Sequence, residues 1–311
     1  MRIIRGVHNL PGNHAQRCVA TIGNFDGVHR GHQAIVQRVC ERARELGLPA
    51  CVMVFEPQPL EFFAPDAAPA RLMRFRDKVE ALRALGVDQV VCLQFNRRLR
   101  DMSALTFIER VLVRGLGVRH LVVGDDFRFG CDRSGDFAML AHEGALRGFT
   151  VEATPTVLVE GARVSSTRVR DALAAGDFGT AERLLGRPYT IAGKVMHGRK
   201  LGRTLDVPTA NVALARRRSP LRGVYVVEAR AGDRIWQGVA NVGKRPTVSG
   251  VRQQLEVHLF GFSGDLYGRR LETRFWCKIR DEHTFDSVQA LQAAIHADIA
   301  WAHDWFSKHS N

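Results

Sequence analysis

The sequence predicts two domains: an N-terminal α/β domain built on a parallel sheet with helices on both faces, and a C-terminal antiparallel β-barrel with a terminal helix. Up to about residue 186, apolar strand-like runs alternate with segments of helical period, which is typical of a parallel sheet. The pattern then changes, and short alternating strands follow one another between Gly, Pro and Asp turns. Strands at this density, followed by one amphipathic helix, are typical of a closed barrel. We therefore expect domains at 1–186 and 187–311, each long enough to bury a core.

Apolar periodicity defines the individual elements. In the N-terminal domain it predicts strands at 18–22, 50–55, 89–95 and 120–123, and helices at about 35–46, 75–85 and 107–116. In the C-terminal domain it predicts strands at about 189–197, 223–231, 234–242, 252–259 and 271–280, with a helix starting near 286. Ligands of an open parallel sheet bind beyond the carboxyl ends of its strands. The segments 23–32, 56–59 and 124–130 follow three of the predicted strands, so we expect a ligand site among them.

A glycine-rich turn, Gly-Asn-Phe-Asp-Gly-Val-His-Arg-Gly-His at 23–32, joins the first of these strands to a helix. This geometry aims free backbone N–H groups and the positive end of a helix dipole at an anion. His29 and His32 are three residues apart, so in a first helical turn they would share a face and reach one phosphate chain. Spacing alone leaves open a plain tight connection, metal ligands or surface histidines. Gly23, Gly27 and Gly31 would let the backbone come close to a ligand, because no Cβ is in the way.

A second anion-binding feature is expected where the N-terminal domain closes, at Ser-Ser-Thr-Arg-Val-Arg, 165–170. Ser or Thr is a natural helix N-cap, and the hydroxyls of Ser165, Ser166 and Thr167 together with Arg170 would face an anion at the helix start. The alternative is that Ser166 only caps the helix while the arginines are solvated.

The C-terminal half contains a further basic, glycine-punctuated stretch at 193–203 that suits phosphate and runs into Pro-Thr-Ala-Asn at 208–211. In an extended segment Thr209 and Asn211 point to the same side, and their oxygens are donors that Mg²⁺ accepts beside ATP phosphates. Without further information, Thr-x-Asn is more often a turn device. Glu256 would face one side of its strand, which is usually a solvated side.

Composition limits the class of protein. Hydrophobic residues make up 45% and charged residues 25%, as in ordinary globular proteins, and no apolar run approaches the roughly 20 residues of a membrane span. The first residues lack the apolar core of a signal peptide, and six scattered Cys without a C-x-x-C pair suit reduced thiols, so we expect a cytoplasmic protein that needs no membrane. The net charge of +13 suits nucleic acid or ligands carrying several phosphates. Its only Arg triple, at 216–218, is not interleaved with aromatics, so no nucleic-acid partner is expected.

The motifs together resemble one family. The decapeptide at 23–32 resembles the H-x-G-H motif of nucleotidyltransferases, in the form typical of the bacterial bifunctional riboflavin kinase/FAD synthetases. The strings S-S-T-x-x-R at 165–170 and V-G-D-D-F-R-F-G at 123–130 are similar to further motifs of that family. G-x-V-x-H-G-x-x-x-G-R at 193–203, P-T-A-N and Gly-Val-Ala-Asn-Val-Gly-x-Arg-Pro-Thr at 238–247 are similar to its riboflavin kinase module.

This resemblance implies a Rossmann-like FMN adenylyltransferase domain, a riboflavin kinase barrel and two reactions. The barrel would phosphorylate riboflavin to FMN with Mg-ATP, and the α/β domain would join FMN to the AMP part of a second ATP. The implied catalytic residues are Glu256, as general base of the kinase, and His29, His32 and Arg170 of the adenylyltransferase. The implied nucleotide contacts are Gly23, Asn24, Phe25, Asp26, Gly31, Asp126, Ser165, Ser166 and Thr167 in the first half, and Gly193, His197, Gly198, Lys200 and Gly202 in the second.

The remaining implied assignments are Phe127, Arg280 and Glu282 beside the flavin, and Thr209 and Asn211 as metal ligands. The expected cofactor is Mg²⁺, with ATP, riboflavin, FMN and FAD as substrates or products, and the expected state is a monomer or weak homo-oligomer. The chain departs from the family at Asp206, where Gly is usual, which adds a negative charge near the phosphates. Two other functions stay open: nucleotidyl transfer to another phosphorylated acceptor, and nucleotide-responsive nucleic-acid binding.

Overall fold

The computed structural model describes residues 1–10, 12, 17–198, 207–214, 218–247 and 250–309, without the side chains of 244–252. The chain forms two compact units. One consists of Met1–Pro69 with Phe75–Ser165, and the other of Ala70–Arg74 with Ser166–Asn311. Lys200, Gly202 and Asp206, which the sequence places at the kinase nucleotide site, lie outside the described residues. The division of activities at residue 186 stays a prediction.

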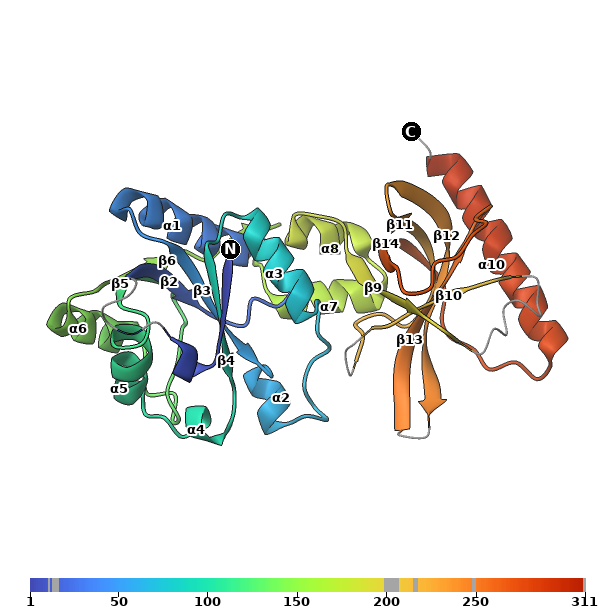
Figure 1. The fold of residues 1–311 in the computed structure, drawn as a ribbon. Helices are drawn as coiled ribbons and strands as arrows, with labels where there is room; N and C mark the ends of the chain where they lie inside the picture. The colour runs from blue at the N-terminus through green and yellow to red at the C-terminus, as the bar shows by residue number, and fades with distance from the viewer. Residues whose placement is uncertain (11, 13–16, 199–206, 215–217, 248–249, 310–311) are drawn as a thin grey trace. The chain divides into compact units, whose positions relative to one another are not determined.

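A six-stranded parallel sheet forms the centre of the first unit (Figure 1), in the order β1-β4-β3-β2-β5-β6. Its strands are β1 (Arg2–Arg5), β2 (Cys18–Ile22), β3 (Ala50–Glu56), β4 (Gln89–Gln94), β5 (Val118–Gly124) and β6 (Thr150–Thr154). This confirms the predicted parallel sheet, whereas β1 and β6 had no clear signal in the sequence. From β2 the chain proceeds through β3 and β4 toward one edge, and β5 lies on the other side of β2. The turns after β2 and β5 therefore flank the point where strand order reverses, the usual ligand crevice of such sheets.

The helices of this unit follow the predicted βα alternation with one correction. They are α1 (Arg30–Leu46), α2 (Pro59–Phe63), α3 (Phe75–Ala84), α4 (Arg97–Arg100), α5 (Ala104–Phe107) and α6 (Phe137–Arg147). Helix α1 buries Val36, Val39, Cys40 and Ala43, and Gly47 ends it in a left-handed conformation at φ 62°. The helix predicted at 107–116 is present but begins earlier and is of mixed type: α5 ends at Phe107, and a π-helical turn, Ile108–Val113, continues it. Apolar periodicity cannot distinguish these helix types because both bury the same side chains.

A charged cluster joins α1 to the edge strand β6. Both oxygens of Glu152 accept hydrogen bonds from Arg38 (2.5 and 3.1 Å), and Arg42 adds a third at 3.0 Å. These hydrogen bonds lower the pKa of Glu152 to about 2. The buried His120 of β5 lies 3.3 Å from the same carboxylate, and burial lowers the pKa of its imidazole. The cluster ties the last strand of the sheet to the helix that follows the glycine-rich turn.

The second unit contains a closed antiparallel barrel, as predicted, and its strands follow the order β10-β13-β12-β11-β14-β9. Its strands are β9 (Thr190–Met196), β10 (Ala210–Val212), β11 (Gly223–Ala231), β12 (Arg234–Thr247), β13 (Gly250–Leu259) and β14 (Arg270–Arg280). The terminal helix α10 (Val288–His309) packs on the outside of the barrel through Ala302 and Phe306, which contact Val226 and Val239.

Two short helices belong to the barrel unit although they precede the predicted boundary: α7 (Ser166–Ala175) and α8 (Phe178–Leu185). Phe178 of α8 packs on two barrel rings, Tyr225 at 5.8 Å and Phe275 at 6.2 Å between ring centroids. Tyr189 donates from its hydroxyl to the Leu72 carbonyl at 3.0 Å. Aromatic packing and this hydrogen bond hold α8 and the segment Ala70–Arg74 in the same compact unit.

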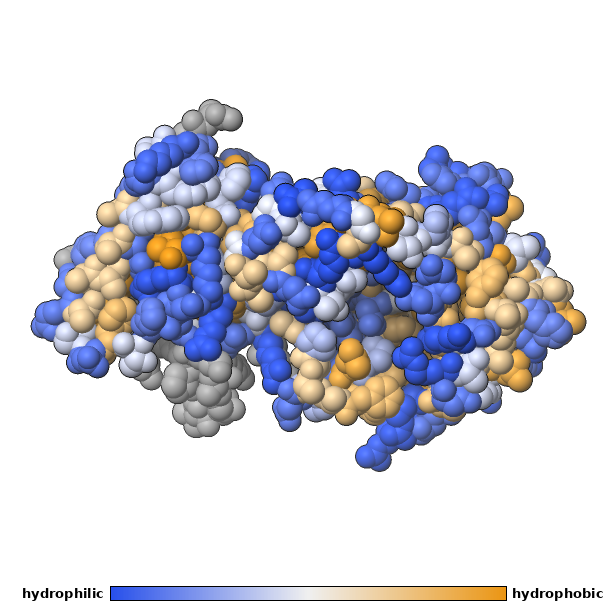
Figure 2. Space-filling model, turned by 180° about the vertical axis from the view of Figure 1, so that it is seen from behind, coloured by the Kyte–Doolittle hydropathy of each residue, from blue (hydrophilic) through white to orange (hydrophobic). Residues whose placement is uncertain are grey.

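Apolar residues occur in small groups among polar ones on the face seen in Figure 2. Among the described residues, none of the helices has both the length and the hydropathy that a membrane span requires.

Candidate active sites

The turn after β2 has an unusual backbone. Phe25 and Val28 adopt positive φ values of 47° and 41°, a region that non-glycine residues rarely occupy, while Gly27 has φ 85°. The side chains of Phe25, Asp26 and Val28 are each 1% exposed, so packing holds the turn in this shape. Strained backbone of this kind persists only where its surroundings fix it, and it concentrates at ligand sites.

His29 caps α1 rather than lying inside its first turn. Its backbone is extended (φ −70°, ψ 170°), and its Nδ1 accepts a hydrogen bond from the His32 backbone N–H at 3.3 Å. The two imidazoles stack, with centroids 3.6 Å apart and planes at 15°. A Cβ on Gly31 would lie 3.3 Å from the His29 ring, so glycine leaves room for this ring at the helix start. The predicted proximity of the two histidines is therefore present, through a cap and a stack instead of a shared helical face.

His32 has an unused polar atom. Its Nδ1 is buried, and it neither accepts nor donates a hydrogen bond among the described residues. Burial, then the neighbouring His29 and Lys78, lower the pKa of the His32 imidazole well below its ordinary value, so the ring is neutral at pH 7. Lys78 of α3 is fully buried and donates from Nζ to the Asn24 carbonyl at 2.6 Å. The buried ammonium group of Lys78 thus holds the backbone of the turn in place and makes the electrostatic potential there more positive.

The loop after β5 carries two of the predicted residues. Asp126 is exposed and forms an ion pair with Arg163 at 2.7 Å, and the Phe127 ring stacks on Phe129 with centroids 5.6 Å apart. An aromatic cluster that the sequence reading missed lies after β3 and β4, where Phe62 and Phe63 of α2 pack edge-on against Phe95. Phe63 is 59% exposed, so the cluster offers a ring surface to solvent.

Ser166 and Thr167 are the first two residues of α7, and Ser165 precedes it. Arg170 donates from Nε to the Ala70 carbonyl at 2.6 Å. This contact belongs to the barrel unit, and the predicted role of Arg170 toward an anion stays a prediction.

In the barrel, strand register brings together polar residues that are far apart in sequence. Glu256 of β13 lies directly opposite Asn211 of β10 on one side and Asn241 of β12 on the other. Side chains of a strand alternate between faces, so Glu256 and His258 point outward while Leu255 and Val257 fill the barrel. Asn211 Oδ1 accepts a hydrogen bond from Gln254. The result is a row of two carboxamides and one carboxylate across three strands.

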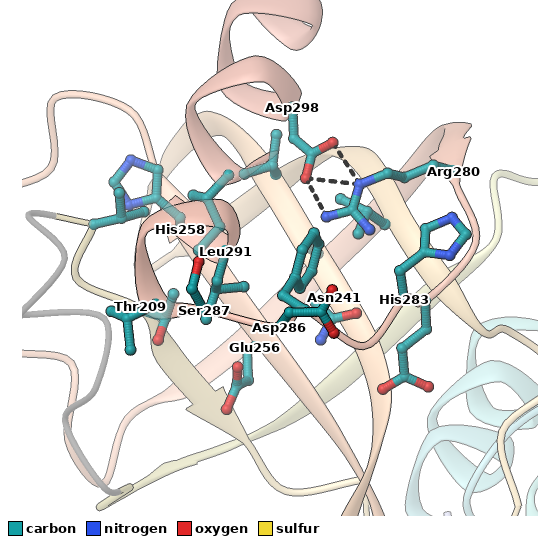
Figure 3. Close-up of a pocket in the computed structure, with 18 residues that line it drawn as sticks. Thr209, Asn241, Glu256, His258, Arg280, His283, Asp286, Ser287, Leu291 and Asp298 are labelled. Atoms are coloured by element: carbon teal, nitrogen blue, oxygen red, sulfur yellow. Dashed lines mark hydrogen bonds and ion pairs between the residues drawn. The ribbon is translucent and has the colours of Figure 1, made fainter. Parts of the chain in front are cut away.

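Two members of this row, Asn241 and Glu256, border a cavity of about 540 Å³ between the barrel and α10, which is within the range of small-molecule sites. Figure 3 shows Thr209, Asn241 and Glu256 on the barrel side and Leu291 and Asp298 of α10 above them. Its remaining wall is formed by apolar side chains and by the segment after β14: Val207, Val224, Val239, Ala240, His258, Arg280, Glu282, His283, Phe285, Asp286, Ser287, Val288 and Ile295.

Charged groups at the upper edge of the cavity are already paired. Arg280 binds both oxygens of the buried Asp298 at 2.9 and 2.7 Å, which attaches α10 to the end of β14. Glu282 pairs with Arg222 at 3.2 Å. The structure therefore brings the predicted flavin-side residues Arg280 and Glu282 into the same cavity as Glu256. Phe127, the third residue predicted beside a flavin, lies in the other unit.

A second cavity of about 300 Å³ lies near the other face of β13 and is lined by Val257, Leu259 and Tyr267. Thr209 borders both cavities. His197, predicted at the kinase nucleotide site, stacks on Tyr267 with ring centroids 3.9 Å apart.

Close packing explains why glycine is required at Gly193 and Gly198, the two described glycines of the predicted kinase phosphate segment. A Cβ on Gly193 would lie 2.5 Å from the Ala213 carbonyl oxygen, and one on Gly198 would overlap the Asn211 carboxamide. Gly198 therefore leaves room beside a predicted metal ligand, whereas Gly193 lets two segments of the barrel wall approach each other.

Two family models match the chain: one described as FAD synthetase over residues 12–168, and one described as riboflavin kinase over 185–306. The bifunctional riboflavin kinase/FMN adenylyltransferase of Pseudomonas fluorescens is 60% identical over 303 residues, 97% of each chain. The protein of that description from Escherichia coli K12 is 51% identical, covering 98% of each chain. A crystal structure described as a macrolide-efflux protein from Streptococcus pneumoniae superimposes with a TM-score of 0.80 at 28% identity and covers 99% of each chain. The two family models and the full-length relatives agree, and the chain belongs to the family of bifunctional riboflavin kinase/FMN adenylyltransferases.

Proposed function

We propose that the barrel unit phosphorylates riboflavin to FMN with ATP and that the sheet unit adenylylates FMN to FAD with release of pyrophosphate. Membership of the family supports both activities. The observation that carries the kinase assignment is the position of Glu256, between Asn211 and Asn241 at a cavity large enough for a flavin. A carboxylate so placed can take the proton of the primary ribityl hydroxyl as that oxygen attacks the γ-phosphorus of ATP.

The two cavities of the barrel suit two substrates. The larger one has an apolar wall that includes Val224, Val239 and Leu291, which suits a flat ring system, and its polar row suits a polyol. The smaller one contains the Tyr267 ring and adjoins Thr209, which suits the base and phosphates of a nucleotide. Because Thr209 borders both, the phosphate to be transferred would lie beside it, within reach of the hydroxyl at Glu256.

Mg²⁺ is part of this proposal through Thr209 and Asn211. A hydroxyl and a carboxamide are hard oxygen donors, and they fit a cation whose other ligands come from nucleotide phosphates and water. Among the described residues there is no group of three or more His, Cys, Asp or Glu arranged to hold a metal, which agrees with an ion that arrives with ATP. When bound, the ion would neutralise charge on the phosphates. Asn211 is held ready by its hydrogen bond from Gln254 and by the space above Gly198.

For adenylyl transfer we assign the turn after β2 as the triphosphate site. The helix start, the two stacked imidazoles and the buried Lys78 all favour negative charge there. The FMN phosphate is itself the nucleophile, so these groups need only orient the triphosphate and stabilise charge on the leaving pyrophosphate. The predicted parts of Ser166, Thr167 and Arg170 in this step rest on their sequence motif. The exposed Phe63 ring, which packs against Phe62, is a candidate surface for the flavin of FMN.

The remaining expectations also stay proposals: a cytoplasmic enzyme, a monomer or weak homo-oligomer, and no nucleic-acid partner. The cytoplasmic location is supported by the six cysteines, all of which are free thiols.

The test is to incubate the protein with riboflavin and Mg-ATP and to separate the flavins by chromatography. Formation of FMN followed by FAD supports the proposal. FMN without FAD, even when FMN is supplied, would remove the adenylyltransferase assignment, and FAD formed only from supplied FMN would remove the kinase assignment. Omission of Mg²⁺ with a chelator tests the metal, and it should stop both reactions.

A further inference from the structure

Asn241 lines the larger cavity, and one polar atom of its side chain has no partner in the described part of the barrel. The Oδ1 atom of Asn241 is buried, and it accepts no hydrogen bond from any described residue. Leaving a buried carbonyl oxygen unpaired is costly, and most buried polar atoms of folded proteins are paired. A valine or leucine would avoid this cost at the centre of β12, whose neighbours Val239 and Val242 are both apolar. The chain therefore carries a destabilising residue at the wall of its cavity.

The neighbours of Asn241 show what the atom faces. Asn241 lies directly opposite Glu256 in the β12–β13 register, and both line the cavity (Figure 3). Two charged groups of the cavity wall have partners of their own, since Arg280 binds Asp298 and Glu282 binds Arg222. The equivalent carboxamide across β13, Asn211, accepts from Gln254. Asn241 is thus the carboxamide of the row whose oxygen has no hydrogen-bond partner among the described residues.

We propose that Asn241 is a specificity-determining residue of the kinase site, and that its carboxamide oxygen accepts a hydrogen bond from a secondary hydroxyl of the ribityl chain. This inference rests on the proposed kinase function. An acceptor beside the general base would orient the polyol so that its terminal hydroxyl meets Glu256. It would also select flavins that carry a hydroxylated chain over flavins that lack one, because only the hydroxyl satisfies the buried oxygen.

The decisive variant is Asn241→Leu, which keeps the size of the side chain and removes its polar atoms. Binding is measured by flavin fluorescence with two probes, riboflavin and lumiflavin, the second of which has the same ring system but no ribityl chain. We expect riboflavin affinity to fall about 3- to 10-fold, the range of one neutral hydrogen bond, with lumiflavin affinity unchanged. The thermal unfolding midpoint should stay the same or rise, because an unpaired buried oxygen is removed. If Asn241 served only to stabilise the fold, Asn241→Leu would lower the thermal unfolding midpoint.

Equal losses of riboflavin and lumiflavin affinity, or no loss of either, would overturn the proposal. Gln237→Leu is the matched control, since Gln237 is exposed on the same strand and outside the cavity; it should change neither affinity. If Asn241→Leu does not fold, Asn241→Ala is measured against the same two probes. Conversion of supplied FMN to FAD reports the integrity of each variant. If the wild-type protein makes no FMN from riboflavin, the proposed function fails; if it makes FMN and Asn241→Leu keeps the riboflavin preference, only the inference fails.

Discussion

The two candidate sites are built in different ways. The turn after β2 is continuous in sequence, from Gly23 to His32, and local devices shape it: a positive φ at Phe25, the cap by His29 and the missing Cβ of Gly31. The barrel cavity draws Glu256 and Asn241 from two strands and Asp298 from the terminal helix, and Asn211 lies opposite Glu256 on a third strand.

The first site therefore depends on the backbone of one segment, and the second on the register of a closed sheet. If the two are separate, a substitution at one should leave the reaction at the other intact. The following experiments test this independence.

The largest effect is expected for Glu256→Gln. Loss of the general base should lower FMN formation from riboflavin about 10²- to 10⁴-fold, because the attacking hydroxyl keeps its proton. Conversion of supplied FMN to FAD should stay within a factor of two. Glu272→Gln, on the exposed face of β14, is the control and should leave both rates unchanged. Kinase turnover that survives in Glu256→Gln would remove this residue from the role of base.

A smaller effect, about 100-fold, is expected on FAD formation for His29→Asn. Asparagine is among the best N-cap residues, so α1 should keep its start and the protein its stability, while the imidazole is lost. His29→Ala removes the cap as well and should also lower stability by about 1 kcal/mol. Comparing the two variants separates chemistry from capping, with His142→Asn on the exposed side of α6 as control. An equal loss of FMN formation in His29→Asn would contradict separate sites.

Gly31→Ala should have a still smaller effect, about a 10-fold loss of FAD formation, because the added Cβ would press on the His29 ring at 3.3 Å. Alanine is favoured over glycine inside a helix by up to about 1 kcal/mol, so thermal stability should hold or increase. Gly179→Ala in α8, where a Cβ meets only ordinary contacts at 3.5 Å, is the control. If both thermal stability and the rate of FAD formation fall, the substitution has disrupted α1 and has not simply displaced the imidazole.

The smallest effect is expected for Glu152→Gln, which should leave both activities intact at pH 7. The arginines hold the folded-state pKa of Glu152 at about 2, against an ordinary value of 4.5. The stabilisation is therefore fully present above pH 4.5 and is lost as the pH falls toward 2.

We expect Glu152→Gln to be about 1–2 kcal/mol less stable than the wild type at pH 7, after allowance for solvent screening, and nearly equal to it at pH 2. Chemical denaturation at several pH values measures the difference. Glu80→Gln, which breaks an exposed pair with Arg76, should show almost none. A pH-independent difference would mean that the Glu152 contacts stabilise by packing alone.

The same contrast explains what could be read from the sequence. The turn after β2 was found directly because its residues are contiguous, and the βα alternation placed it correctly at the carboxyl end of a strand. The cap by His29 was not foreseen, since it depends on a ring stacked over Gly31. Sequence motifs also predicted Glu256 and Asn211 as site residues, and the structure places them opposite each other.

Asn241 and Asp298 were missed as site residues for a physical reason. Asn241 and Glu256 are fifteen positions apart, and the register of the antiparallel pair β12–β13 places them side by side. Asp298 reaches the cavity because α10 folds back over the barrel and binds Arg280. A signal was available in hindsight: a carboxamide within the otherwise apolar run Val239–Ala240–Asn241–Val242 departs from what a core-facing strand requires.

The most direct measurement of separate sites is a mixing assay with riboflavin and Mg-ATP, followed by chromatography of the flavins. Alone, Glu256→Gln should make neither FMN nor FAD, and His29→Asn should accumulate FMN. The mixture should make FAD, because FMN released by one variant is adenylylated by the other. A mixture that forms no FAD, although Glu256→Gln converts supplied FMN and His29→Asn makes FMN, would contradict two independent sites that exchange FMN through solution.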